Sequence, residues 1–575
     1  MIFQIGIVIL EFLTTPSGML AITAAFVLYA VLRPRVFASA CGAVERPLSN
    51  LARHRALVVG LVFFGVLAAR LLILPFLPVP VPGIHDEFSY LLMADTFTHG
   101  RLTNPPHPMW MSFETFHVNW LPTYSSMYPP AQGFVLAIGQ WLGHPWIGVL
   151  LSAGAMCAAI FWMLQAWMPA RWAFLGASLV AMKFGLDSYW INSYWGGAVA
   201  ATGGALVLGA LARIVRRANV GDALLLGLGL AILANSRPYE GFLFSIPVAF
   251  AFFWWLAGKT QSRITRTLRI RRTVVPLLAV LTLTISFMGY YNWRLTGNPL
   301  LLPHRLNART YSSASLFVWD TVQPPRVYNN QQFEDFYSGW AREEYQRTWG
   351  DFAKVSWLKI TRYHPAFFWA GALLVLPGLP FAFGDRRIRL LAIVFLFGLF
   401  AIFSVVWSNA HYAAPLTCVF YALIVQAIRH LRTVRLAGRP VGLALSWAVV
   451  LLLAFDTARA VVDRECDPEQ WTCWGDPSRL VLKKKIEEMP GKYLIVVRYA
   501  KHHNVHDEWV YNGADIDGAK TVWARELSPE QNAKLFAYFK DRTVWLVTPD
   551  IDSTELLPYS KLPALSNYRA SPGEW

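Results

Sequence analysis

The amino-acid sequence predicts a mainly α-helical, polytopic membrane protein of about 11–12 transmembrane helices with a small C-terminal α/β domain. Of its 575 residues, 55% are hydrophobic and only 15% are charged. Apolar runs of about 20 residues, the length that crosses roughly 30 Å of hydrocarbon, recur along most of the chain. Soluble proteins do not repeat such runs, so this composition excludes a soluble enzyme or binding protein.

Residues 1–55 form an N-terminal membrane segment followed by a basic connector. The apolar stretch Ile2–Leu32 is interrupted by Thr14–Gly18. It has no early basic region and no small-residue cleavage site, so we expect it to be retained rather than removed as a signal peptide. The connector Arg33–His54 separates it from the next span.

Residues 56–460 hold the main membrane domain. Its first apolar run extends from Ala56 to Pro80, and a later run is divided by His144-Pro145 into a short and a longer half. The expected spans after the first are Pro130–Trp167, Arg171–Leu186, Gly196–Ile214, Asp222–Asn235, Tyr239–Leu256, Val274–Tyr291, Pro365–Ala382, Leu390–Trp407, His411–Ile428 and Val441–Ala458.

Basic residues set the orientation, because cytoplasmic loops of membrane proteins are enriched in Lys and Arg. The basic loops are Arg33–Arg53, Arg171, Arg213–Arg217, Lys259–Arg272, Arg386–Arg389 and Arg429–Arg439. They alternate with loops poor in basic residues, so the net charge of +16 reflects topology and does not indicate nucleic-acid binding. This orientation places two large loops, at about 77–130 and 292–362, and the tail after residue 461 outside the cytoplasm.

The tail, residues 461–575, is polar and mixed in charge. Strand-like runs at Lys492–Arg498 and Thr543–Thr548 flank a helix-like segment, Ser528–Phe539, in which Ser528 is a suitable N-cap and Pro529 stands at the first helical position. We expect a small α/β domain. Cys466 and Cys473 lie close together in sequence, and an oxidising compartment would allow a disulfide between them.

One stretch places ionisable residues where a membrane–water boundary is expected. The stretch Pro82–Tyr90 contains His85, Asp86 and Glu87, and an amphipathic segment follows, Phe88–Phe97, which Gly100 closes as a helix C-cap. We expect this helix to lie flat on the membrane surface. Arg237 falls on the same outer side, against the positive-inside trend, which suggests that it binds an anionic group.

Four short motifs follow this stretch in a characteristic order. They are Tyr128-Pro-Pro-Ala-Gln-Gly133, Asn235-Ser-Arg-Pro-Tyr-Glu-Gly241, Thr296-Gly-Asn-Pro299 and His411-Tyr-Ala-Ala-Pro415. With the acidic first outer loop, they resemble the membrane glycosyltransferases of the GT-C fold. The most similar branch is the family-39-like group, which includes protein O-mannosyltransferases and the lipid A aminoarabinose transferase. Ala131 stands where this group usually has Gly. The resemblance covers about residues 56–430.

The resemblance implies a hexosyl- or pentosyltransferase of the cell envelope. It would move a sugar from a polyprenyl-phosphate-linked donor to a protein, lipid or glycan acceptor on the periplasmic side of a bacterial inner membrane. An attacking hydroxyl must lose its proton, so we expect Asp86 to act as general base and Glu87 to orient the acceptor or share the proton. Direct displacement would invert the anomeric carbon. No cofactor is expected, and no ligand cluster in the sequence requires a metal ion.

The charge of the leaving lipid phosphate needs a cation, and Arg237 suits that contact. The other expected substrate-binding residues are His85, Tyr128, Gln132, Tyr239, Glu240 and His411. Structural interpretations compete with these roles. Asp86 and Glu87 would also suit the positive end of a helix dipole, Arg237 would also pair with Glu240, and the Tyr128 motif would also begin a helix.

Two other functional classes fit parts of the sequence. A lipid or glycan transporter, including a flippase, would explain the many spans, although the polar residues gather on the outer side rather than at midplane and no internal repeat is visible. A non-catalytic envelope assembly protein would explain the tail, but it leaves the acidic first loop unexplained. Substrate accumulation without chemistry would favour the transporter.

Overall fold

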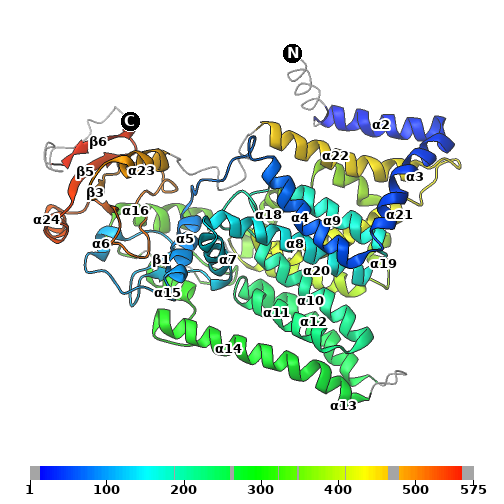
Figure 1. Ribbon diagram of the computed structural model, residues 1–575, viewed down its shortest axis with the longest axis horizontal. Coiled ribbons are helices and arrows are strands. Elements are labelled where there is room, and N and C mark those ends of the chain that lie inside the picture. The colour runs from blue at the N-terminus through cyan, green and yellow to red at the C-terminus, as the bar shows by residue number, and fades with distance from the viewer. Residues whose placement is uncertain are drawn as a thin grey trace.

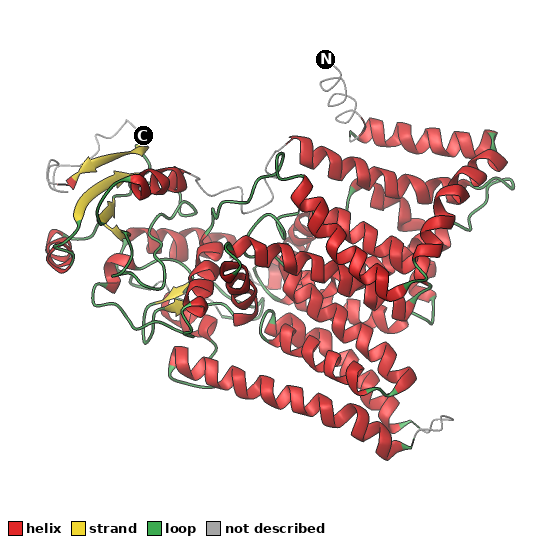
Figure 2. Ribbon diagram, in the orientation of Figure 1, coloured by secondary structure: helices red, strands yellow, loops and turns green. Residues whose placement is uncertain are grey.

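The structure, a computed structural model, is mostly helical (Figure 2). Its helices form an elongated bundle with a small sheet at one end (Figure 1). A mainly α-helical membrane protein with a C-terminal sheet region is therefore confirmed. The residues that the structure describes are 13, 15–186, 188–258, 265–321, 323–324, 326–345, 349–407, 409–463 and 478–559.

Seven helical segments among these residues are long and apolar enough to cross a membrane. Five of them are single helices: α4 (Arg55–Leu72), α8 (Pro145–Trp167), α10 (Ala198–Arg217), α12 (Pro238–Ala257) and α22 (Val441–Asp463). The segment Arg266–Thr296 contains α13 (Arg266–Arg269) and α14 (Val275–Thr296). The segment Ala410–Leu431 contains the 3₁₀ helix η5 (Ala410–Leu416) and α21 (Thr417–Leu431). This is a multi-pass membrane protein.

Two sharply bent helix pairs raise the number of spans to as many as nine. One pair, α2 (Pro16–Leu32) and α3 (Pro34–Leu51), bends by 115°. The other, α18 (Phe352–Phe367) followed by Ala370–Gly384, bends by 103°. The expectation of about 11–12 spans also counted shorter runs, which here form α9 (Ala170–Gly185), α11 (Val220–Ala234) and α20 (Arg389–Ser404).

The break expected at His144-Pro145 separates α7 (Pro130–Trp141) from α8. Gly143 permits the reversal because its φ is +111°, a conformation that other residues rarely adopt. The two helices then approach so closely that a Cβ on Gly139 would lie 2.3 Å from the backbone nitrogen of Gly148. Glycine at both positions therefore allows α7 to pack tightly on α8.

The two ends of the bundle differ. In Figure 1, α3, α13 and α19 (Leu379–Gly384), which carry or adjoin basic loops, lie at one end. Helix α5 (His85–Thr98), the small sheet and the short elements of the loops lie at the other. Those short elements are α6 (Trp110–Phe113), β1 (Val118–Asn119), β2 (Ser125–Ser126), α15 (Pro303–Tyr311), α16 (Gln331–Glu334) and α17 (Ala341–Tyr345).

The C-terminal sheet has the strand order β4-β3-β5-β6. The central strand β3 (Tyr493–Val497) runs parallel to β4 (Thr521–Arg525) and β5 (Thr543–Thr548), and β6 (Asp552–Pro558) is antiparallel to β5. All five residues of β3 are buried, as expected for a parallel strand covered on both faces. Helices α23 (Ser478–Glu488) and α24 (Pro529–Tyr538) complete this region, and the Ser528 hydroxyl caps α24 as predicted.

The sheet and the first outer loop share one hydrophobic core. Leu92 of α5 and Trp120 and Tyr124 of the loop are buried against Leu494 and Val522 of the sheet. Residues of α5 are consequently covered by protein on several sides, and Tyr90, Leu92, Met93 and Phe97 are all buried. The apolar residues of this helix pack against α7 on one side and the sheet on the other, and its position flat on the membrane stays a prediction.

Candidate active site

Three ionisable residues occupy the first turn of α5. The helix starts after Ile84, whose backbone is extended, and the Glu87 carboxylate accepts the backbone N–H of Ile84 at 3.3 Å. Successive residues of a helix point about 100° apart. His85, Asp86 and Glu87 therefore face three different surroundings, although they are neighbours in the sequence.

Glu87 faces the protein interior. Its side chain is fully buried and accepts backbone N–H groups of Gly83 at 2.8 Å and of Tyr194 at 3.0 Å, in addition to that of Ile84. Burial raises the pKa of this carboxyl to about 7, although these hydrogen bonds act to lower it. Its contacts fasten the start of α5 to the loop that follows α9. This position suits anchoring and offers no access to an acceptor.

Asp86 faces a polar and aromatic group of side chains. The Tyr128 hydroxyl donates a hydrogen bond to Oδ1, and His117 Nε2 lies 3.8 Å from Oδ2. The side chain of Asp86 is 16% exposed, in contrast to the fully buried Glu87. Tyr128 also stacks on Tyr90, with ring centroids 4.4 Å apart. Tyr128 thus orients the carboxylate instead of only beginning α7.

His85 faces the C-terminal region. Its Nε2 lies 2.8 Å from the carbonyl oxygen of Val505, and its ring stacks on His506 at 5.7 Å. A carbonyl can only accept, so Nε2 carries the proton and Nδ1 keeps a lone pair. Burial, the largest cause, lowers the pKa of His85 well below 6.5, so the imidazole is neutral at pH 7.

His85, Asp86 and His117 together form a possible metal site. One ligand atom from each lies within 4.8 Å of the others. His117 has a φ of +61°, uncommon for a residue with a side chain, and its carbonyl accepts the Ser89 hydroxyl at 2.7 Å and the Met127 N–H at 3.1 Å. A neutral histidine whose other nitrogen donates to a carbonyl is the usual form of a metal ligand. These residues therefore suit a divalent cation.

Arg237 is the residue predicted to bind the lipid phosphate. It precedes α12, and its guanidinium carbon lies 4.5 Å from the centroid of the Tyr412 ring. Among the described residues, no carboxylate oxygen lies within 4.0 Å of its nitrogens, so Arg237 makes no close ion pair with Glu240, although the charge of Glu240 acts on it. The charges of both Arg237 and Asp86 act on Tyr90 and on Tyr412. The charges of Asp86 and Arg237 thus act on the same two tyrosines.

Three further predicted residues are held by protein partners. Gln132 donates to the carbonyl of Tyr194 at 2.9 Å, and the Tyr239 hydroxyl contacts Ser404 Oγ at 2.6 Å. The Tyr189 hydroxyl lies 2.9 Å from His411 Nδ1 and accepts the His411 backbone N–H at 2.9 Å. The charge of Arg237 acts on His411. The expected disulfide between Cys466 and Cys473 falls outside the described residues.

The structure adds residues that sequence patterns did not single out. His117 has a positive φ and lies beside Asp86. Val505 and His506 belong to the tail, and both contact His85. Tyr412 directly follows His411 in the motif His411-Tyr-Ala-Ala-Pro415, so this motif marks the position of Tyr412 in the sequence. For His117 and Val505, no local pattern marked the position, because only the tertiary fold brings them to His85.

Comparison with known proteins gives similar solved structures. An oligosaccharyltransferase from Archaeoglobus fulgidus, in complex with Zn and sulfate, is 12% identical over 84% of this chain and 67% of its own, with a TM-score of 0.44. ArnT from Cupriavidus metallidurans in the apo state is 13% identical over 89% of this chain and 94% of its own, with a TM-score of 0.45. ArnT bound to undecaprenyl phosphate is 11% identical over 87% and 90%, with a TM-score of 0.43.

No family model matches the chain, and no curated protein matches it. Membrane glycosyltransferases, which the sequence motifs resemble, are nevertheless among the similar solved structures. At these sequence identities and TM-scores the likeness assigns no activity to this chain. The function is therefore inferred from the site itself.

Proposed function

We propose that this protein is a membrane glycosyltransferase that moves a hexose or pentose from a polyprenyl-phosphate-linked donor to an acceptor. The reaction takes place at the end of the bundle that holds α5, which faces the periplasm when the basic loops face the cytoplasm of a bacterial inner membrane. One observation carries the proposal. Asp86 is a partly exposed carboxylate, Arg237 has no close ion pair among the residues that the structure describes, and the charges of both act on Tyr90 and Tyr412.

In the proposed step, Asp86 accepts the proton of the acceptor hydroxyl as its oxygen bonds to the anomeric carbon. The bond from that carbon to the phosphate oxygen breaks, and the lipid phosphate leaves with its electron pair. Arg237 stabilises the phosphate charge by charge-assisted hydrogen bonds. A single displacement inverts the anomeric carbon. Tyr128 holds Asp86 in place, and Glu87 positions the helix turn that carries it.

His85, Asp86 and His117 are the residues that would hold a divalent cation. When bound, such an ion supplies positive charge beside the reacting groups. Asp86 would then serve as a ligand as well as, or in place of, a proton acceptor. Both roles require the carboxylate, but they differ in their dependence on added metal, so a chelator experiment distinguishes them.

The test is reconstitution of the purified full chain in liposomes with a panel of labelled polyprenyl-phosphate sugars, with and without a divalent cation. We expect consumption of one donor and release of the polyprenyl phosphate. Movement of the intact donor across the bilayer without cleavage would instead support a transporter. No consumption of any donor, with or without candidate acceptors, would contradict the proposal.

A further inference from the structure

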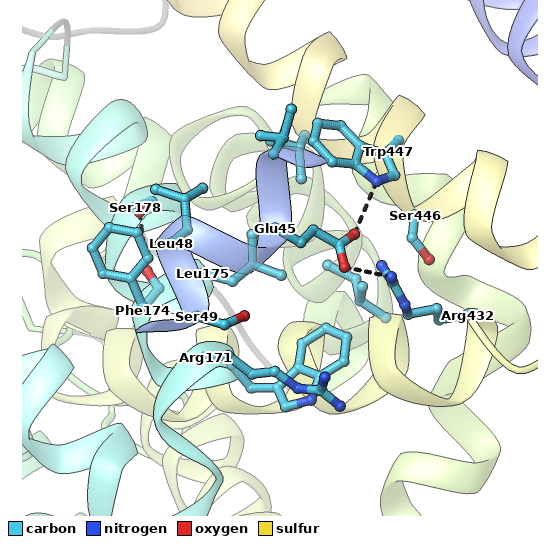
Figure 3. Close-up of a pocket in the computed structure, with 14 residues that line it drawn as sticks. Glu45, Leu48, Ser49, Arg171, Phe174, Leu175, Ser178, Arg432, Ser446 and Trp447 are labelled. Atoms are coloured by element: carbon cyan, nitrogen blue, oxygen red, sulfur yellow. Dashed lines mark hydrogen bonds and ion pairs between the residues drawn. The ribbon is translucent and has the colours of Figure 1, made fainter. Parts of the chain in front are cut away.

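A second site lies at the basic end of the bundle, away from α5. A cavity of about 240 Å³ opens between α3, α9, α21 and α22. Its walls are mainly apolar and include Leu48, Phe174, Leu175, Ile428 and Val450. Figure 3 shows Glu45 extending from α3 toward Arg432 and Trp447, with Arg171 on another side of the cavity.

Two arginines, Arg171 and Arg432, line the cavity, and Arg429 lies near Trp172 outside its lining. Arg171, Arg429 and Arg432 have guanidinium carbons 5.4, 5.9 and 6.0 Å from the centroid of the Trp172 ring. Three cations are thus gathered around one aromatic side chain. Arg171 is exposed, and the charge of Arg171 acts unfavourably on Arg429. Such a cluster of like charges is stabilised by an anion.

Glu45 is the acid that lines the cavity, and the charge of Asp385 acts on Arg429 outside it. Glu45 accepts Arg432 Nη2 at 2.6 Å and Trp447 Nε1 at 3.1 Å. This pair neutralises Arg432 and fixes α3 at the cavity. Arg171 and Arg429 have no such acidic neighbour in direct contact among the described residues; Arg429 donates to the neutral side chain of Gln426 at 2.7 Å. The site therefore keeps a net positive charge.

We propose that this cavity binds an anionic phospholipid of the membrane leaflet on the basic side. The phosphate lies against Arg171, which lines the cavity, and an acyl chain occupies the hollow between Leu48 and Leu175. The mainly apolar walls require a ligand with a hydrocarbon part, and the arginines require a negative head group; an anionic phospholipid provides both. This inference is independent of the proposed sugar transfer.

A lipid in this cavity would contact α3 and so affect how α3 packs on the bundle. This helix belongs to the pair that bends by 115° and reaches the bundle beside α9 and α22. An acyl chain in the cavity would touch α3 on one side and α9 on the other. The bound lipid would thus fasten the N-terminal helix pair to the bundle.

The experiment is native mass spectrometry of the full-length protein titrated with phosphatidylglycerol or with phosphatidylcholine of the same acyl chains. We expect one phosphatidylglycerol to be retained and phosphatidylcholine to bind more weakly. Arg171→Gln should weaken phosphatidylglycerol binding about fivefold, the size of one basic contact at a lipid surface. Arg271→Gln, an exposed arginine on the same basic side but outside the cavity, should leave it unchanged. Leu175→Trp, which fills the hollow, should reduce binding of both lipids.

Three outcomes would overturn the proposal. One is equal binding of both lipids by the wild type, and another is an equal loss in Arg171→Gln and Arg271→Gln. The third is displacement of phosphatidylglycerol by polyprenyl phosphate at equal or lower concentration, which would assign the cavity to the sugar donor. Inorganic phosphate at the lipid concentration should not compete. If Leu175→Trp fails to fold, the surface variant Arg171→Gln still decides the result.

Discussion

The two ends of the bundle use charged residues differently. At the end that holds α5, the Arg525–Glu508 ion pair has both side chains only 1% exposed, and His85 and Glu87 are buried. At the basic end, the Arg432–Glu45 pair is 30% and 31% exposed. Buried charges cost free energy unless they are paired, whereas exposed basic residues mainly set the orientation in the membrane. The fully buried ion pair Arg525–Glu508 thus lies at the end for which sugar transfer is proposed.

Breaking the two ion pairs gives the largest expected contrast in stability. Glu508→Gln leaves Arg525 buried without its carboxylate and should lower the free energy of unfolding by about 3–5 kcal/mol. Glu45→Gln at the basic end should cost less than about 1 kcal/mol, because its pair is partly exposed. Thermal unfolding in detergent, followed by tryptophan fluorescence, measures both. Equal losses would remove the distinction between the two ends.

A second comparison concerns transfer activity in variants of two arginines, Arg237 and Arg294. Arg237→Gln removes the cation proposed to stabilise the leaving phosphate and should lower kcat/KM for the donor roughly 10–100-fold, the effect of a hydrogen bond to a charged group. Arg294 is the matched control, because it also lies over a tyrosine ring, that of Tyr290 at 5.9 Å, but is exposed. Arg294→Gln should leave the rate unchanged. A similar loss in both variants would argue against a specific phosphate contact.

A chelator and a variant of His117 test whether a divalent cation takes part in sugar transfer. If His85, Asp86 and His117 hold a divalent ion, a chelator should lower the transfer rate and added metal should restore it. His117→Gln should then raise the metal concentration needed for half-maximal rate by at least about 10-fold, since even supporting partners of metal ligands have effects of that size. Full activity of the wild type after exhaustive chelation would leave Asp86 with the role of base alone.

We expect Glu87 to have a smaller, pH-dependent effect on the free energy of unfolding. Burial raises its pKa from 4.5 to about 7, so between these pH values the folded state binds more protons than the unfolded state. Stability from this group is therefore present at low pH and lost as the pH rises toward 7, by at most about 1.4 kcal/mol per pH unit. Unfolding measured at pH 5 and pH 7 should show this slope in the wild type but not in Glu87→Gln. The same slope in both would assign it to other groups.

Local patterns predicted the regular parts of the molecule well. The apolar run of β3, the cap of α24 at Ser528 and the break before Pro145 each depend on residues close together in the sequence. The site was less predictable. Asp86 and Glu87 are adjacent and chemically alike, and only the rotation of α5 in the fold turns one toward the polar region and the other into the interior. His117 and Val505 reach His85 through tertiary contacts that no local pattern encodes.

The sequence also suggested a tail separate from the membrane domain. The shared core of Leu92 and Trp120 with Leu494, and the hydrogen bond from His85 to the Val505 carbonyl, join the two. Deleting the tail would therefore expose apolar surface and leave His85 without its partner, so such a deletion tests folding as much as function. Point variants of single residues give cleaner evidence.

The most direct test compares Asp86→Asn with Glu87→Gln and the wild type in single-turnover sugar transfer, using the donor that the wild type consumes. Circular dichroism and thermal unfolding check that each variant folds. We expect Asp86→Asn to lose at least about two orders of magnitude in rate, the effect of removing a general base, and Glu87→Gln to retain most of the rate per folded molecule. Equal rates for Asp86→Asn and the wild type would contradict the account.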